Sequence, residues 1–276
     1  MRLAIVQMTA SDAPDENIAV LQSAVADAAR SGADMVLTPE VSNCLSASRE
    51  HQRAVLMPEP RDPMLAAMRA AAREHGVWVL LGSLALRTAD PEGRFANRSI
   101  LVDDAGAVRA HYDKIHMFDV AVSETETYRE SAAYRPGTRA TLAETPWGKL
   151  GMTVCYDLRF PALYRRLAQA GAAILAVPSA FSPVTGEAHW EPLLRARAIE
   201  TGCFVVAPAQ TGRHAARAGR ARTTHGHSMV VDPWGTVLLD AGTAPGTFLC
   251  DIDPAAVAEA RRRVPSLEAA SQWEGP

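Results

Sequence analysis

The sequence predicts a mixed α/β fold. Short apolar runs alternate with amphipathic helical patterns along the 276 residues. Other apolar runs are separated only by turn sequences, namely Asp104-Ala105-Gly106, Pro146-Trp147-Gly148 and Pro233-Trp234-Gly235. Crossover helices join parallel strands, whereas hairpins join antiparallel ones, so the two kinds of connection together predict a mixed sheet. No Gly-x-Gly-x-x-Gly follows a predicted strand, which argues against a dinucleotide-binding fold.

The expected strands are apolar runs bounded by turn or polar residues. They cover Leu3 to Met8, Met35 to Thr38, Val77 to Leu84, Ser99 to Asp103, Leu150 to Val154, Ala173 to Pro178, Cys203 to Ala207, Ser228 to Asp232, Val237 to Asp240 and Thr247 to Asp251. Helices are expected where an amphipathic pattern ends near a glycine or follows a proline. They cover Asp15 to Arg30, Asp62 to His75, Pro161 to Gly171 and about Glu187 to Thr201.

The composition favours a cytoplasmic, single-domain protein that acts on a small molecule. One domain over residues 1–276 is expected, with a C-terminal tail from about 266 that is loose or reaches a partner subunit. A net charge of -3 offers no basic field for nucleic acid. No apolar stretch approaches the ~20 residues of a membrane span, and the first residues are too short a run for a signal peptide. The cysteines are too far apart for a redox or zinc motif, so free thiols and no metal are expected at Cys44, Cys155, Cys203 and Cys250.

Cys155 lies at the end of the predicted strand Leu150 to Val154 and just before the helix that Pro161 opens. Ligands of open α/β folds bind at the carboxyl ends of strands, and helix N–H groups favour a thiolate. The segment therefore makes Cys155 a candidate nucleophile. The alternative is a buried cysteine that packs as a small hydrophobe. Glu40 also follows a predicted strand, and Lys114 follows a hairpin arm from about Val108.

Glu40, Lys114 and Cys155, in this order, resemble the Glu-Lys-Cys triad of the nitrilase superfamily of carbon–nitrogen hydrolases. The resemblance covers nearly the whole chain. It is closest to the branch that contains deaminated glutathione amidase and ω-amidase, on the motifs Lys114-Ile-His-Met-Phe-Asp119, Glu130-Ser131 with Pro136-Gly137, Cys155-Tyr-Asp-Leu-Arg-Phe-Pro161, Pro178-Ser-Ala-Phe181, Gly186-Glu-Ala-His189-Trp190 and Gly226-His-Ser228.

The resemblance implies a four-layer α-β-β-α sandwich with two mixed sheets, a homodimer and no cofactor. It implies that Cys155 attacks an amide carbonyl, that Glu40 moves the proton, and that Lys114 stabilises the oxyanion with the backbone N–H of Tyr156. Glu130 is then a second acid that orients substrate or Lys114. The expected activity is hydrolysis of the carboxamide of a small 2-oxo acid, with deaminated glutathione favoured.

Substrate contacts are also implied by the resemblance. Arg159 would hold a 2-oxo acid carboxylate in bidentate fashion, and Phe181 would pack against the substrate. An ω-amidase acting on α-ketoglutaramate and a general aliphatic amidase remain alternatives. A true nitrilase is disfavoured because Cys155 is followed by Tyr-Asp rather than Trp-Glu, and a class I glutamine amidotransferase because its Gly-x-Cys-x-Gly elbow is absent. A catalytically silent scaffold would have lost a member of the triad.

Three features keep two interpretations each. His189-Trp190 either shapes the pocket or begins a packed helix. The arginine-rich stretch from Ala215 to Arg222 is either a solvated loop or a contact for an acidic γ-glutamyl substrate analogue. Cys44, four residues after Glu40, is either packing or a thiol near the site that can be oxidised.

Overall fold

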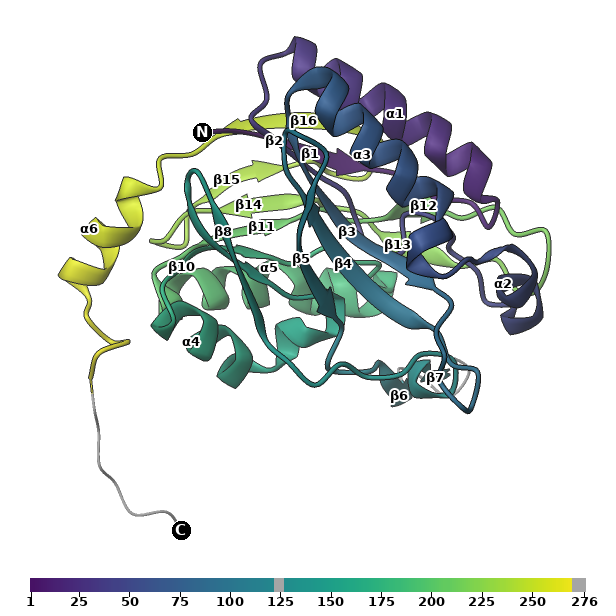
Figure 1. Cartoon of the computed structure of the whole chain (residues 1–276). Helices are drawn as coiled ribbons and strands as arrows, with labels where there is room; N and C mark the ends of the chain where they lie inside the picture. The colour runs from purple at the N-terminus through teal and green to yellow at the C-terminus, as the bar shows by residue number, and fades with distance from the viewer. Residues whose placement is uncertain (122–126, 270–276) are drawn as a thin grey trace.

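The computed structural model describes residues 1–121 and 127–269, which form two six-stranded sheets between two layers of helices (Figure 1). The first sheet, in order of pairing, contains β16 (Gly246–Asp251), β1 (Arg2–Gln7), β2 (Met35–Leu37), β3 (Trp78–Leu86), β4 (Ala96–Val102) and β5 (Val108–Asp113). The second contains β15 (Val237–Asp240), β14 (Met229–Val231), β11 (Phe204–Ala207), β10 (Ala172–Ala176), β9 (Gly148–Met152) and β8 (Thr141–Thr145).

Each sheet has three parallel central strands flanked by antiparallel ones. In the first sheet these are β1, β2 and β3, and in the second they are β9, β10 and β11. Helices α1 (Pro14–Arg30) and α3 (Pro63–His75) are the crossovers of the first sheet, and α4 (Pro161–Gln169) and α5 (Pro183–Thr201) are those of the second. The predicted mixture of crossovers and hairpins therefore occurs in both halves.

The smaller elements lie around this frame. They are α2 (Arg49–Val55), α6 (Ala255–Arg263), the 3-10 turns η1 (Glu59–Arg61), η2 (Glu130–Ala132) and η3 (Cys155–Arg159), and the two-stranded ribbons β6 (Asp119–Ala121) with β7 (Thr127–Arg129) and β12 (Thr211–Arg213) with β13 (Thr223–His225).

Alternation along β1 shows why the sandwich has four layers. Leu3 and Ile5 belong to the core that includes residues of both sheets, whereas Ala4 and Val6 pack with apolar side chains of α1 and α3. Successive side chains of a strand point to opposite faces, so a strand with an unbroken apolar run, such as Leu3 to Val6, needs a partner layer on each side. The predicted four-layer α-β-β-α sandwich with two mixed sheets is confirmed.

Local capping explains the helix boundaries. The Asp62 carboxylate accepts a hydrogen bond from the Leu65 N–H at 2.8 Å, and Gly76 ends α3 with φ of 64°. In α5, Ser182 is the N-cap and Pro183 the first residue, so the helix begins before the expected Glu187.

The strands that precede the candidate residues end on the same side of the molecule. Glu40 follows β2 and Cys155 follows β9, both of which are central parallel strands. Strand β4 is antiparallel to β3 and β5 is antiparallel to β4, so β5 runs in the same direction as β2. Lys114 consequently also follows the carboxyl end of a strand, and the three side chains meet where the two sheets face each other.

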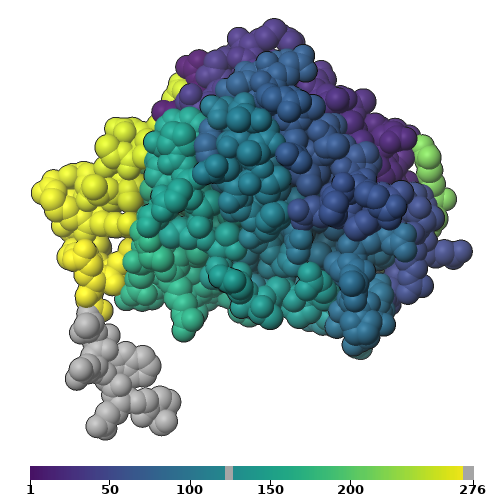
Figure 2. Space-filling view, in the orientation of Figure 1, coloured from purple at the N-terminus to yellow at the C-terminus, as the bar shows by residue number. Residues whose placement is uncertain are grey.

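The C-terminal segment lies at one side of the molecule, where Figure 2 shows it in yellow. The Arg165 guanidinium of α4 donates hydrogen bonds to the carbonyl oxygens of Ser266 and Leu267 at 3.3 to 3.4 Å. This part of the predicted tail from about 266 thus contacts its own chain, and residues 270–276 lie outside the described residues.

None of the helices in the described ranges is long and apolar enough to cross a membrane.

Candidate active site

Cys155 begins the 3-10 turn η3 and has a left-handed backbone, with φ of 52°. Such a conformation is strained for a residue with a Cβ and persists only where neighbours hold it. The Cys155 N–H donates to the Pro178 carbonyl at 2.9 Å, and the Val154 N–H donates to the Asp157 carboxylate at 2.9 Å. The chain therefore does not pass from strand to helix at Cys155 as expected, because this turn separates β9 from α4.

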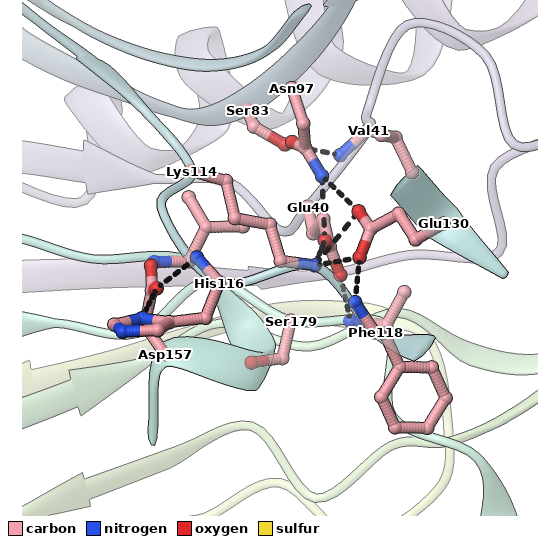
Figure 3. A network of polar contacts seen from close by, with 12 residues as sticks. Glu40, Val41, Ser83, Asn97, Lys114, His116, Phe118, Glu130, Asp157 and Ser179 are labelled. Carbon is pink, nitrogen blue, oxygen red and sulfur yellow. Dashed lines mark hydrogen bonds and ion pairs between the residues drawn. The ribbon is translucent and has the colours of Figure 1, made fainter. Parts of the chain in front are cut away.

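Asp157 joins the turn to the loop that follows β5. Its fully buried carboxylate accepts hydrogen bonds from the Tyr112 hydroxyl at 2.6 Å and from the His116 backbone N–H at 3.1 Å. Figure 3 shows the His116 side chain beside the same carboxylate, and its Nδ1 atom lies 2.6 Å from it. The segment that carries Lys114 and the turn that carries Cys155 are thereby held to one shared acceptor.

Glu40 occupies a tight turn that is also strained. The next residue, Val41, has φ of 48°, and its N–H donates to the Ser83 hydroxyl at 2.8 Å. A β-branched residue rarely adopts this conformation, so the hydrogen bond from Val41 helps to hold the turn. The Glu40 Oε2 atom accepts a hydrogen bond from the Ala180 N–H at 2.9 Å, which fixes the carboxylate from the second sheet.

Lys114 lies between two carboxylates (Figure 3). Its Nζ atom is 3.0 Å from Glu40 Oε1 and 2.8 Å from Glu130 Oε2. The Asn97 amide donates to Glu40 at 2.8 Å and to Glu130 at 3.2 Å, and the Phe118 N–H donates to Glu130 at 2.7 Å. Lys114 and Glu40 are 2% and 4% exposed, so these ionic contacts form largely away from water.

The charges in this cluster favour its ionised form. Burial alone raises the pKa of Glu40, but the positive charges of Lys114 and Arg222 and hydrogen bonds from Cys155 and Lys114 outweigh it, and the pKa lies below its ordinary value. Burial lowers the pKa of Lys114, but Glu130 and Glu40 raise it by more, so it lies well above the ordinary value. Lys114 is therefore a cation and Glu40 a carboxylate at neutral pH.

Cys155, in contrast, favours its neutral form. Burial and the negative charge of Glu40 raise the pKa of the thiol, and Lys114 and the Ala180 N–H compensate for only part of this. The resting group is thus a protonated thiol beside an ionised acid. The expectation that helix N–H groups favour a thiolate is wrong, because the desolvation of the sulfur and the nearby carboxylate both disfavour its charge.

A cavity of about 290 Å³ opens over these groups. Six of the seven residues that the sequence suggests for the site line it, namely Glu40, Lys114, Glu130, Cys155, Tyr156 and Phe181. Arg159 is not among the lining residues. Its guanidinium lies 5.7 Å from the Phe181 ring centroid and 6.0 Å from that of Tyr156, so it stands beside two residues that do line the cavity.

The two residues of His189-Trp190 have separate environments. Trp190 is buried against Phe181, with ring centroids 4.7 Å apart, and its indole N–H donates to the His227 carbonyl at 2.7 Å. His189 is exposed, and its Nδ1 atom lies 3.3 Å from Arg159. Trp190 thus supports a cavity wall from behind, and His189 contacts the neighbouring arginine.

All four cysteines are free thiols. Cys44 is buried and lines the cavity, and its Sγ lies 3.6 Å from the Asp12 carbonyl oxygen. Burial raises its pKa to about 12, which makes it a poor target for oxidation. Within the described ranges, no group of three or more His, Cys, Asp or Glu side chains is placed to hold a metal ion.

Sequence analysis missed three contributors to the site. Asn97 lies in the apolar strand β4, and its one available signal was a polar residue inside a buried run. The Ala180 N–H is a backbone group, so the residue type at position 180 gives no indication of its role. Arg222 belongs to the arginine-rich stretch, but nothing in that composition distinguishes the arginine that reaches the cavity from those that do not.

Comparison with known proteins assigns the chain to a family. A family model for carbon–nitrogen hydrolases matches residues 2–262. This chain belongs to the carbon–nitrogen hydrolase family. It is 40% identical over 267 residues to the deaminated glutathione amidase of Yersinia enterocolitica, covering 96% of this hydrolase and 91% of the relative. It is 42% identical over 270 residues to that of Mus musculus, covering 96% and 82% of the two chains.

A solved structure gives the same assignment. The crystal structure of the C. elegans NitFhit protein superposes on this hydrolase with a TM-score of 0.88 at 34% identity. The match covers 98% of this chain and 64% of the NitFhit chain, so this hydrolase spans about two thirds of that protein. Membership of the nitrilase superfamily, expected from the triad and its flanking motifs, is confirmed.

Proposed function

We propose that this hydrolase is an amidase that cleaves the amide bond of deaminated glutathione through a thioester on Cys155. The observation that carries the proposal is the buried Lys114, held between the carboxylates of Glu40 and Glu130 in the cavity that Cys155 lines. The substrate follows from the relatives named deaminated glutathione amidase, which match nearly the whole chain. Small-molecule amides as a class follow from the family.

In the first half of the reaction, Glu40 takes the proton of the Cys155 thiol as sulfur attacks the amide carbonyl carbon. The negative charge that develops on the carbonyl oxygen is stabilised by Lys114 and by the Tyr156 N–H. Glu40 then gives the proton to the amide nitrogen, the C–N bond breaks, and the amine leaves. A protonated thiol beside an ionised Glu40 is the starting state that this step requires.

In the second half, Glu40 takes a proton from a water molecule while the oxygen of that water attacks the thioester carbon. The C–S bond breaks, the carboxylic acid is released, and the proton on Glu40 returns to the sulfur. Glu130 holds Lys114 in place throughout, since both of its carboxylate oxygens accept hydrogen bonds from the ammonium group at 2.8 to 2.9 Å.

Arg159 binds the carboxylate of the 2-oxo acid in this proposal. Its guanidinium stands beside Tyr156 and Phe181 at the edge of the cavity, where a substrate could reach it from the nucleophile. Arg159→Lys should then fail to rescue the loss caused by Arg159→Ala, because an ammonium cannot form two parallel hydrogen bonds. Equal losses on charged and neutral amides would instead assign Arg159 a role in holding the turn.

The substrate assignment is tested by measuring product release from a panel of deaminated glutathione, α-ketoglutaramate, glutamine, a nitrile and an N-carbamoyl amino acid. We expect the highest kcat/KM on deaminated glutathione. A clear preference for α-ketoglutaramate would make the protein an ω-amidase. Mass spectrometry of quenched reactions should find the acyl group on the peptide containing Cys155, and an acyl group on Cys44 or Cys203 would refute the mechanism.

We also propose a single-domain homodimer in the cytoplasm. Helix α5 carries two branched apolar side chains that are more than half exposed, Val184 and Ile199, as a subunit contact would require. Arg197 of the same helix turns inward, since its Nε–H donates to the Leu158 carbonyl at 2.9 Å, so it is not part of this exposed face. Light scattering at several concentrations tests the dimer, and a monomer at all of them would refute it.

A further inference from the structure

Cations outnumber carboxylates in the cavity. Among the described residues that line it, the ionised side chains are Glu40, Glu130, Lys114, Arg49, Arg129 and Arg222. Both carboxylates bind Lys114, and among the described residues neither forms an ion pair with an arginine. The surplus of positive charge means that the cavity favours a ligand with more negative charge than one carboxylate supplies.

Arg222 is held on the wall of the cavity with hydrogen-bonding capacity to spare. One terminal nitrogen donates to the Ala180 carbonyl at 2.6 Å, and the guanidinium lies 5.6 Å from the Tyr128 ring centroid. Its Nε–H is buried and has no hydrogen-bond partner among the residues that the structure describes. A buried donor without a partner costs free energy, so an acceptor supplied by a ligand would relieve that cost.

Arg49 has the same arrangement at the start of α2. One terminal nitrogen donates to the Glu92 carbonyl at 3.0 Å, and its buried Nε–H also lacks a partner within residues 1–121 and 127–269. The two segments lie side by side, since a Cβ placed on Gly219 would be 3.3 Å from the Cβ of Ser48. Two preoriented guanidiniums, each with an unused N–H, thus belong to neighbouring segments of the cavity wall.

The position of Arg222 indicates which part of the substrate it meets. Ala180, whose carbonyl holds Arg222, donates its N–H to Glu40. In the proposed mechanism Glu40 protonates the departing amine, so Arg222 lies on the side from which the amine leaves. Arg159 is assigned to the acyl part beside Tyr156 and Phe181. The two groups of arginines therefore correspond to the two ends of the substrate.

We infer that Arg49 and Arg222 form an anion subsite that binds a carboxylate on the amine half of the substrate. This inference rests on the proposed function, since deaminated glutathione carries such a carboxylate on its glycine and a second one on its 2-oxo acid. The substrate class is then an amide that joins a 2-oxo dicarboxylic acid to an acidic amine. The subsite distinguishes this substrate from α-ketoglutaramate, whose leaving group is ammonia.

Arg49 offers the cleaner test because Arg222 also holds Ala180. Wild type, Arg49→Ala and a control, Arg53→Ala, are assayed on deaminated glutathione and on its analogue with a glycinamide end. Arg53 is exposed one helical turn away and does not line the cavity. Because a hydrogen bond to a charged group is lost, kcat/KM of Arg49→Ala on the acid should fall by about 10- to 100-fold. The fold-loss on the glycinamide analogue should be at least tenfold smaller. Arg53→Ala should behave as wild type on both.

Wild-type enzyme provides a second test that needs no variant. Cysteinylglycine, the amine product, should inhibit hydrolysis of deaminated glutathione at least tenfold more strongly than cysteinylglycine amide. Equal inhibition, or equal losses on acid and amide for Arg49→Ala, would overturn the subsite and leave the amidase assignment intact. If wild type hydrolyses neither form of deaminated glutathione, the proposed function itself fails.

Discussion

Burying the ammonium group of Lys114 costs free energy, and the size of that cost depends on the groups that contact it. An isolated ammonium at 2% exposure would lose its proton, but Glu40 and Glu130 keep it charged. The same contacts keep Glu40 ionised. Lys114 and Glu40 therefore each maintain the charge of the other.

Replacing Lys114 by methionine should abolish activity and also destabilise the fold. We expect kcat to fall at least ~100-fold, as for loss of an oxyanion donor, and the free energy of unfolding at pH 7 to fall by about 3 to 5 kcal/mol because two carboxylates lose their cation. The pKa of Glu40, lowered in the wild type, would then be raised by burial. In the wild type Glu40 stabilises the fold above its unfolded pKa of about 4.3, whereas in the variant it destabilises the fold as pH rises through the raised value.

Chemical denaturation at pH 5 and pH 7 measures this difference. The loss of stability relative to wild type should be smaller at pH 5 than at pH 7. Lys149→Met, which removes a partly exposed lysine paired with Glu144, serves as the control and should change little at either pH. A loss that does not depend on pH would show that Lys114 stabilises by packing alone.

The Cys155 thiol should remain protonated at mild alkaline pH. A free cysteine is half ionised at about pH 8.5, but burial and Glu40 raise the pKa of Cys155. The ultraviolet difference between wild type and Cys155→Ala should therefore show no thiolate at that pH. A thiolate signal near neutral pH would mean that Cys155 and Lys114 form an ion pair, and that Glu40 is not the base for the first step.

At the scale of elements, the 3-10 turn η3 and the loop after β5 depend on Asp157. Its carboxylate accepts from Tyr112 and His116, which flank Lys114, and from Val154, which immediately precedes Cys155. The turn thereby maintains the left-handed backbone of Cys155 without help from a regular helix. In the proposed mechanism the Asp157 carboxylate is a positioning group, since it is fully buried and does not line the cavity.

Asp157→Asn should impair chemistry more than binding. An amide offers one acceptor oxygen in place of two, so the turn shifts, and a displacement of about 1 Å at the nucleophile can cost ~100-fold in rate. We expect kcat to fall by about 10- to 100-fold while KM changes less than threefold. Arg159→Ala is the comparison, since loss of a substrate contact should act on kcat/KM for carboxylate substrates. A fall confined to KM would remove the positioning role from Asp157.

At the scale of the whole molecule, the site requires the two sheets to approach closely at their strand ends. Gly82 of β3 lies at this point of contact. A Cβ there would be 1.9 Å from the Thr38 carbonyl oxygen and 2.4 Å from the Cβ of Pro178, which belong to the first and second halves of the sandwich. Any side chain at residue 82 would push apart the segments that lead to Glu40 and Ala180.

Gly82→Ala should lower the free energy of unfolding by about 3 kcal/mol or more, at the upper end of the cost of overpacking a core. The backbone of Gly82 is not left-handed, so the effect is steric. Gly242→Ala is the matched control, because Gly242 has φ of 61° with open space around it and should cost only about 1 to 2 kcal/mol. Equal effects in thermal unfolding would show that the sheets can separate at residue 82 without loss.

The sequence alone was sufficient to predict the main strands and helices and the three residues at the centre of the site. Apolar runs and their capping signals predicted the central strands and the crossover helices, because burial between layers requires continuous apolar sequence. Strand ends and motifs also singled out Glu40, Lys114 and Cys155, which the structure brings together. Short ribbons such as β6 with β7 were not predicted, since their few residues lie near the surface and carry no apolar pattern.

Tertiary structure decided what surrounds those residues and in which state they rest. Desolvation and the neighbouring carboxylate raise the pKa of Cys155, although its sequence context suggested a thiolate. Asn97 and Arg222 reach the site from segments that are remote in sequence, and Arg159 does not line the cavity although it follows Cys155 by only four residues. The sequence determines which functional group a residue carries. Its charge and its partners depend on the fold, because Coulomb energies and desolvation depend on the distances between groups and on their burial.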